Sequence, residues 1–205
     1  MPVVMPEQRA IYFHIPKVAG TSITSYLVRY ASVVRTFIHR PPWMALEHGA
    51  ISESILTNYW KFTFVRNPWS RTVSTWEFWG RVHPDKLHGC KTFSDFIKYY
   101  YDRKPLETFE DVEGSMWPQH KTTHYPKDPR LSMNFVGKFE NLQSDFNIVC
   151  DKLTIKKRKL PCENSAWLKG TYPHYSTYYD FETKEMVAKM FQKDIELFNY
   201  RFEGQ

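Results

Sequence analysis

Short runs of aromatic and β-branched residues alternate along this chain with longer segments in which apolar residues recur at helical spacing. The first run, AIYFHI at 10–15, stops at Pro16 and predicts a strand. The spacing of the apolar residues that follow predicts a helix over roughly 21–31. A strand, a tight loop that contains Gly20, and a helix are the opening of an α/β domain.

The same unit appears a second time. The run YWKFTFV at 59–65 predicts a strand, and the segment 66–79 predicts a helix with Asn67 as its N-cap and Pro68 at its first position. Further strands are expected at 33–38 and 134–139, and further helices at 51–59, 92–101, 141–153 and 181–199. We therefore expect a central parallel β-sheet flanked by helices, with a phosphate-binding strand–loop–helix that resembles a P-loop.

The chain organisation predicted from this pattern is a single domain over 1–205, without an internal repeat or linker. Residues 83–133 are the least regular part of the pattern. They contain a stretch dominated by Pro, Gly, His and Lys, which is typical of a substrate-binding loop or lid. We expect this segment to bind the acceptor substrate.

Composition points to an anionic partner but does not identify it. The chain has 205 residues, of which 42% are hydrophobic and 24% charged, as in ordinary globular proteins. Its formal net charge of +6 favours a nucleotide, a polyanionic substrate, nucleic acid or a membrane surface. Charge alone does not choose among these partners.

The cysteines and the hydropathy of the chain predict a cytoplasmic protein. Cys90, Cys150 and Cys162 are far apart and show no metal-ligand spacing, so we expect reduced thiols and no bound metal. The chain does not begin like a signal peptide, and its apolar runs are too short to span a membrane.

The stretch HIPKVAGTSI at 14–23 carries the first candidate chemistry. A loop between a strand and a helix points backbone N–H groups outward, and the helix dipole favours negative charge there. Gly20 allows a close approach to an anion, Thr21 and Ser22 add hydroxyl donors, and Lys17 adds a positive charge. In the usual phosphate loop, however, the Lys follows the glycines, whereas here it precedes them.

A second basic motif follows the second strand. Arg66 ends that strand, and Ser74 lies eight residues further on, within the next helix. If the two strands are parallel neighbours, both motifs lie at the same carboxyl edge, where α/β proteins bind ligands. Two phosphate-binding motifs at one edge suit a nucleotide that is phosphorylated at both ends.

The stretch IPKVAGTSI together with FVRNPWSRTVSTW resembles the sulfotransferase superfamily, in the branch of the Golgi carbohydrate sulfotransferases and their bacterial relatives. The resemblance extends to NFVGKFENLQSDF and to the tail, YYDFETKEMVAKMFQKDIELFNY. It implies the donor 3′-phosphoadenosine 5′-phosphosulfate (PAPS), with adenosine 3′,5′-bisphosphate (PAP) as the product and no metal.

The resemblance also implies roles for individual residues. The first motif would hold the 5′-phosphosulfate through Lys17, Gly20, Thr21 and Ser22. The second would hold the 3′-phosphate through Arg66 and Ser74. Many members of the family have Thr after the loop Lys, whereas this chain has Val18 and so lacks one hydroxyl donor.

Sulfuryl transfer requires charge stabilisation on the leaving oxygen, which we assign to Lys17, and a base for the acceptor hydroxyl. Members of this branch place a catalytic His between the two motifs, which implies His48 as the base. His39 is the second choice and the Glu47 carboxylate the third. His14 alternates within the first strand and is expected to be packed or hydrogen-bonded in the core.

Several residues keep two interpretations. Arg71 is either a surface charge or a further phosphate contact, and Lys169, Tyr175 and Tyr178 are weak candidates for contacts to the nucleotide. The residues of 83–133 expected to decide the acceptor are Trp117, His120, Lys121, His124 and Tyr125. Basic residues there would suit an anionic acceptor, whereas aromatic residues would suit sugar rings or a planar metabolite.

The expected partners are the nucleotide donor and a hydroxyl-bearing acceptor, either a carbohydrate or a small metabolite, and neither nucleic acid nor a membrane span. Two other functions compete with this interpretation. A P-loop-type nucleotide kinase would need a magnesium ligand and the usual Gly-Lys-Ser/Thr order. A non-enzymatic module that binds polyanions would explain the charge, but it leaves the two ordered motifs unexplained.

Overall fold

The computed structural model describes residues 2–31, 33–34, 39–103, 114–161 and 173–204. The chain divides into two compact units, one formed by 1–65 and 119–164 and the other by 66–118 and 165–205. The predicted strand residues 35–38, Cys162 and Lys169 lie outside the described residues.

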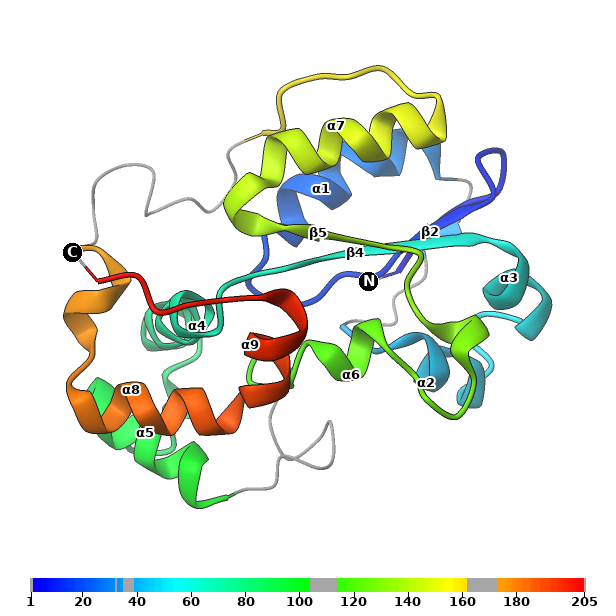
Figure 1. The fold of residues 1–205 in the computed structure, drawn as a ribbon. Helices are drawn as coiled ribbons and strands as arrows, with labels where there is room; N and C mark the ends of the chain where they lie inside the picture. Colours follow the sequence, from blue (N-terminus) through cyan, green and yellow to red (C-terminus); the bar gives the residue numbers. More distant parts are fainter. Residues whose placement is uncertain (1, 32, 35–38, 104–113, 162–172, 205) are drawn as a thin grey trace. The chain divides into compact units, whose positions relative to one another are not determined.

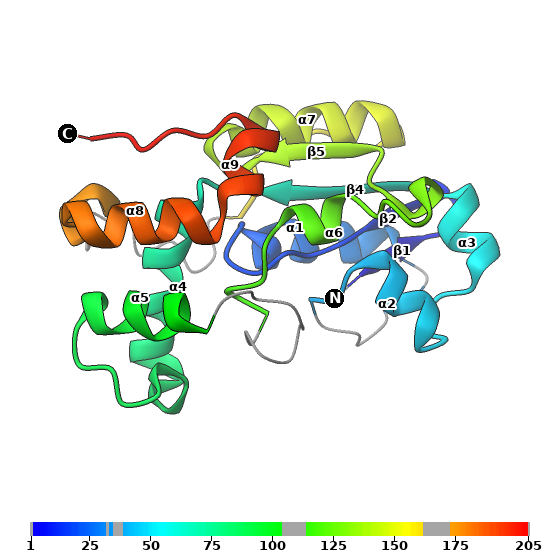
Figure 2. The ribbon, with the colours of Figure 1, turned by 60° about the horizontal axis from the view of Figure 1, so that its bottom comes forward.

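The first unit contains the β-sheet. Among the described residues its strands are β1 (Val3–Met5), β2 (Ala10–Tyr12), β3 (Val33–Val34), β4 (Trp60–Val65) and β5 (Phe135–Lys138). They lie in the order β3-β1-β2-β4-β5, with β2 parallel to β4 and β4 parallel to β5. In Figure 2 the arrows of β4 and β5 point the same way. β1 is antiparallel to both β2 and β3, so the parallel centre of the sheet is extended by an antiparallel edge.

Helices cover both faces of this sheet (Figure 1). They are α1 (Gly20–Leu27), α2 (Pro42–Glu47), α3 (Glu53–Asn58), α6 (His120–Thr123) and α7 (Leu142–Leu153). On one face α1 and α7 pack together, with the rings of Tyr26 and Phe146 5.2 Å apart. On the other face Ile11 and Phe13 pack against Ala45 of α2 and Leu56 of α3. Ile11 of β2 and Phe13 just beyond it therefore face the side of the sheet covered by α2 and α3.

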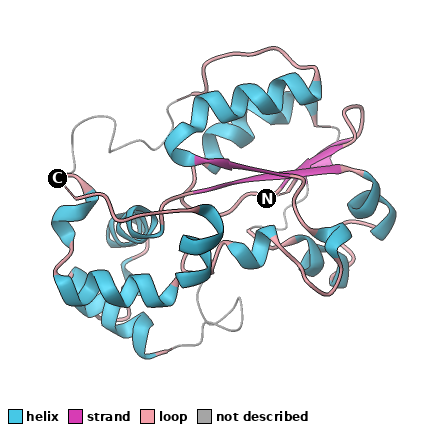
Figure 3. Cartoon of the chain, viewed as in Figure 1, coloured by secondary structure: helices cyan, strands magenta, loops and turns pink. Residues whose placement is uncertain are grey.

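The regular structure of the second unit is helical in its described part (Figure 3). Its helices are α4 (Pro68–Val82), α5 (Phe93–Asp102), α8 (Phe181–Met190) and α9 (Gln192–Phe198). Aromatic side chains join them: the ring of Trp79 on α4 lies 5.9 Å from Phe96 on α5, and Phe93 lies 5.0 Å from Tyr179, which precedes α8. Contacts between aromatic rings therefore hold the helices of this unit together.

The α/β class expected from the sequence is confirmed, and most predicted elements are present. Two differences are informative. The predicted helix over 181–199 is two helices, because the chain leaves helical geometry at Phe191, where φ is −117°. The short strand β1 and the helix α2 were not predicted, since three residues and one and a half turns are too few to show a periodicity.

Within the described ranges, every helix is too short or too polar to cross a membrane. Cys90 and Cys150 are free thiols. The single-domain organisation over 1–205 stays a prediction.

Candidate active site

The loop between β2 and α1 has an unusual backbone. Lys17 and Ala19 both adopt left-handed conformations, with φ of 66° and 63°, and Val18 lies between them. Residues other than Gly rarely take positive φ, and when they do they cluster at functional sites. Backbone that alternates in handedness in this way makes concavities of N–H groups that bind anions.

The start of α1 lacks a side-chain cap. Its N-cap is Ala19, whose methyl group accepts no hydrogen bond, so the first N–H groups of α1 are not satisfied by a capping side chain. Gly20, Thr21 and Ser22 form the first turn, in which Thr21 is exposed and Ser22 is buried. The structure thus brings Lys17, Gly20, Thr21 and Ser22 together on one loop and one helical turn, and the dipole of that helix favours an anion there.

Gly20 is required by a neighbouring side chain. A Cβ atom at this position would overlap the imidazole ring of His14. Burial lowers the pKa of His14 well below its usual value, and the charges of His39 and Lys17 lower it further, so the ring is neutral near pH 7. His14 is packed, as expected, but against the candidate anion loop.

The second motif begins directly after β4. Arg66 is buried, with 4% of its surface exposed, and its Nε donates a hydrogen bond of 3.0 Å to Ser70 Oγ. Ser70 and Ser74 are four residues apart on α4, and therefore lie one turn apart on the same face of that helix. Ser70 was missed in the sequence, although its spacing of four from both Arg66 and Ser74 was a usable signal.

The N-terminus of α4 is capped as predicted. Asn67 is the N-cap, and its Oδ1 accepts hydrogen bonds from the backbone N–H groups of Trp69 (3.1 Å) and Ser70 (3.3 Å). Its Nδ2 donates to the carbonyl of Arg201 (2.8 Å), which anchors the C-terminal segment within the same unit. In this second motif the side chains of Arg66 and Ser74 are therefore better candidates for anion contacts than the helix terminus.

The candidate bases occupy different environments. His48 is the C-cap of α2, is exposed, and accepts a hydrogen bond of 3.3 Å from Arg40 Nη1 at its Nε2. His39 is the neighbour of His14: its Nδ1 donates to the His14 carbonyl (3.2 Å), and the two ring centroids are 4.5 Å apart. Through His14, His39 is connected to the candidate anion loop. Glu47 is an exposed residue at the end of α2.

Arg71 is an internal residue, which favours a structural role over a phosphate contact. It is 2% exposed, its Nη2 donates to the Trp117 carbonyl (2.9 Å), and Asp194 supplies negative charge nearby. Burial lowers the pKa of Arg71 to about 10, and Asp194 opposes this shift, so the guanidinium stays charged near pH 7. It holds the segment before residue 119 against α4.

Tyr178 and Tyr175 also have internal partners. The hydroxyl of Tyr178 donates to Glu77 Oε1 (2.8 Å), and that of Tyr175 accepts from the backbone N–H of Glu203 (2.7 Å). Both bonds lie within the second unit and explain these tyrosines without a nucleotide.

The candidate acceptor residues do not form one cluster within a single unit. Trp117 is buried in the second unit, whereas His120, Lys121, His124 and Tyr125 belong to the first. Tyr125 stacks on Trp43 with ring centroids 5.7 Å apart, and this pair offers a flat aromatic surface. In the parts of the chain that the structure describes, no group of three or more His, Cys, Asp or Glu side chains could hold a metal ion.

Comparison with known proteins shows which family this chain resembles. A model described as "Sulfotransferase family" matches residues 2–201. An uncharacterized protein from Archaeoglobus fulgidus is 26% identical over 113 residues, a match that covers 55% of this chain and 81% of that protein. The family match spans both compact units and both candidate motifs.

Proposed function

Since the chain belongs to the sulfotransferase family, we propose that it transfers a sulfuryl group from PAPS to an acceptor hydroxyl. The donor supplies an activated sulfuryl group and carries phosphate at both ends of its nucleoside. The observation that carries the proposal is the loop between β2 and α1, which combines two left-handed residues with a helix terminus that has no capping side chain.

In this proposal the first motif holds the 5′-phosphosulfate. The first backbone N–H groups of α1 and the hydroxyls of Thr21 and Ser22 bind its oxygens. Lys17, held in a left-handed conformation at the mouth of the loop, stabilises the negative charge that develops on the leaving oxygen. Because Val18 provides no hydroxyl, the backbone and Lys17 carry more of the binding.

The second motif holds the 3′-phosphate. Arg66 presents a guanidinium whose Nε is fixed by Ser70, so its nitrogen fork is restrained before the ligand arrives. Ser74, one turn further along α4, adds a hydroxyl donor. No metal ion is needed in this arrangement, because the positive charge comes from Lys17 and Arg66.

The acceptor hydroxyl must lose a proton, and a His suits this task near neutral pH. We assign the base to His48. Its Nε2 accepts a hydrogen bond from Arg40, so this nitrogen carries the lone pair in the present arrangement. His39 remains the second choice, favoured by its contact with His14 beside the loop. The acceptor is a carbohydrate or a small metabolite, and we expect the reaction in the cytoplasm.

The proposal is tested by a thermal-shift titration with PAP beside ADP, AMP and ATP with magnesium. A ligand at about 100 times its dissociation constant raises the melting temperature of a chain of this size by roughly 5–10 °C. We expect this shift with PAP in the absence of metal, its loss in Arg66→Ala, and its retention in Arg81→Ala, which removes an exposed Arg from the last turn of the same helix. A larger shift with ATP and magnesium would favour the kinase, and no shift with any nucleotide would remove the basis of the proposal.

A further inference from the structure

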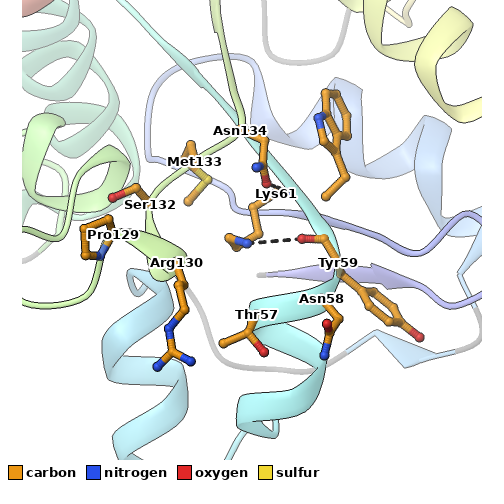
Figure 4. Close-up of a pocket in the computed structure, with 10 residues that line it drawn as sticks. Thr57, Asn58, Tyr59, Lys61, Pro129, Arg130, Ser132, Met133 and Asn134 are labelled. Carbon is orange, nitrogen blue, oxygen red and sulfur yellow. Dashed lines mark hydrogen bonds between the residues drawn. The ribbon is translucent and has the colours of Figure 1, made fainter.

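A cavity of about 390 Å³ lies in the first unit at the amino end of β4 (Figure 4). Its volume is near the lower end of the range for small-molecule sites. The residues that line it come from the end of α3, the start of β4 and the segment that leads into β5. They are Thr57, Asn58, Tyr59, Trp60, Lys61, Pro129, Arg130, Ser132, Met133 and Asn134.

The most unusual member of this lining is Lys61, which is 2% exposed. Its ammonium group donates to two backbone carbonyls at the end of α3, those of Leu56 (2.8 Å) and Tyr59 (3.1 Å). Among the described residues, no carboxylate forms an ion pair with it, and its third N–H has no acceptor. Buried charges in proteins are normally paired, but no described carboxylate lies within ion-pair distance of this ammonium, and only the charge of Asp128 acts on it from further away.

The charges of the residues that line the cavity indicate what kind of ligand it could bind. It contains two cationic side chains, Lys61 and Arg130, and no carboxylate. The two carboxylates that pair with Arg130, those of Asp128 (2.8 Å) and Glu53 (3.4 Å), do not line the cavity. Burial lowers the pKa of Lys61, and the negative charge of Asp128 opposes this shift.

Two side chains of the lining carry hydrogen-bond donors that no described residue uses. The Oδ1 of Asn134 is used by the backbone N–H of Lys61 (2.8 Å), which leaves the Asn134 amide NH₂ as a donor. The Nη1 of Arg130 has no partner among the described residues. A cavity with a cationic floor and donors around it suits a ligand with several acceptor oxygens.

We propose that this cavity binds a small molecule through an oxyanion group, a carboxylate or a sulfate, that accepts hydrogen bonds from the third N–H of Lys61 and from the Asn134 amide, while Arg130 adds positive charge to the lining. The site is distinct from the candidate donor loop. β2 and β4 are parallel, the loop of Lys17 follows the carboxyl end of β2, and the cavity lies at the amino end of β4. The two sites are thus at opposite edges of the sheet, and this proposal does not depend on sulfuryl transfer.

The test uses the Lys17→Ala protein as its parent, which weakens anion binding at the candidate donor loop, and the variants of Lys61 separate the cavity from any anion binding that remains there. Melting temperatures are measured with sulfate, with glucuronate and with chloride at equal ionic strength. The side-chain NMR signals of Lys61 are followed in the same titrations. Lys61→Gln removes the charge but keeps donors for the two carbonyls, Arg130→Gln removes the second cation, and Lys152→Gln is the matched control at an exposed lysine of α7.

We expect sulfate or glucuronate to shift the Lys61 signals and to raise the melting temperature by about 5 °C over chloride at saturation. The increase should vanish in Lys61→Gln, fall by at least half in Arg130→Gln and persist in Lys152→Gln. A response to sulfate alone identifies a sulfate group as the ligand, and a response to glucuronate identifies a carboxylate. Unchanged Lys61 signals with both anions, or an equal sulfate effect in Lys61→Gln, would overturn the proposal and leave Lys61 as a cap of α3. The NMR signals keep the test decisive if Lys61→Gln does not fold.

Discussion

Replacement of Gly20 by Ala separates two reasons for a glycine at this position. The residue is the first of α1 and does not have a positive φ, so Ala is compatible with its backbone. The obstacle is the imidazole of His14, which occupies the space that the new methyl group needs. Either Gly20 is required to accommodate this ring, or it is required because an anion approaches the backbone.

The structure gives the expected magnitude. Forcing one methyl group into a packed site costs about 1–3 kcal/mol. The helix propensity of Ala offsets at most about 1 kcal/mol of this cost. For a chain of this length, 1 kcal/mol corresponds to roughly 2–4 °C, so we expect Gly20→Ala to lower the melting temperature by several degrees. In a His14→Ala background the ring is absent, and the same substitution should be neutral or slightly stabilising.

The assay is a double-mutant cycle in thermal unfolding, with PAP affinity measured on all four proteins. If Gly20 is needed only to make room for the His14 ring, the double variant has the same melting temperature and the same PAP affinity as the His14→Ala protein. If the anion also needs the bare backbone, stability recovers in the double variant but PAP affinity does not. An equal loss of stability from Gly20→Ala in both backgrounds would refute the steric reasoning.

Three further predictions concern the candidate site. Ser70→Ala should weaken PAP binding by about 10-fold, because it removes the hydrogen bond that holds the Arg66 guanidinium, and Ser70→Thr should largely restore binding. Equal PAP affinities of wild type and Ser70→Ala in calorimetry would contradict this role. His48→Gln should lower kcat for sulfuryl transfer to an acceptor found by screening by about 100- to 10,000-fold with little change in PAP affinity, and the same loss in His39→Gln instead would reassign the base. The pKa of His14 is lowered in the folded protein, so below about pH 6.5 the unfolded chain binds a proton that the folded chain does not. The free energy of unfolding is therefore largest above that pH and decreases as the pH falls, by up to ~1.4 kcal/mol per pH unit. The melting temperature of wild type should therefore fall more steeply on acidification than that of His14→Phe, and parallel curves would show that His14 is not the cause.

The fold could be predicted from the sequence where a local signal is strong. The strand over 60–65 is a run of apolar and β-branched residues, and α4 begins at Pro68 with the Asn67 cap that the sequence indicates. The antiparallel addition of β1 was not predictable in this way, because pairing is decided by contacts between distant residues rather than by three residues of local pattern. The division of the tail into α8 and α9 was not predictable either, since the chain leaves helical geometry at Phe191, and residues 181–199 contain no Gly or Pro that would signal a break.

The candidate site was predictable in its residue types but not in the contacts that hold them. The motif order identified Lys17 and Arg66, yet it did not reveal that Ser70 holds the guanidinium or that His14 supports the loop. Alternation along the run 10–15 predicted that His14 is packed; β2 ends at Tyr12, and His14 lies beyond it with its ring against Gly20. A period of two says only which face of a strand a residue occupies. What lies on that face depends on how α1 returns to the sheet. The choice of Gly20 is explained by the same contact, so a glycine that looks like a ligand-binding device in the sequence is also a packing requirement. The double-mutant cycle is informative because only the second of these roles disappears with the His14 ring.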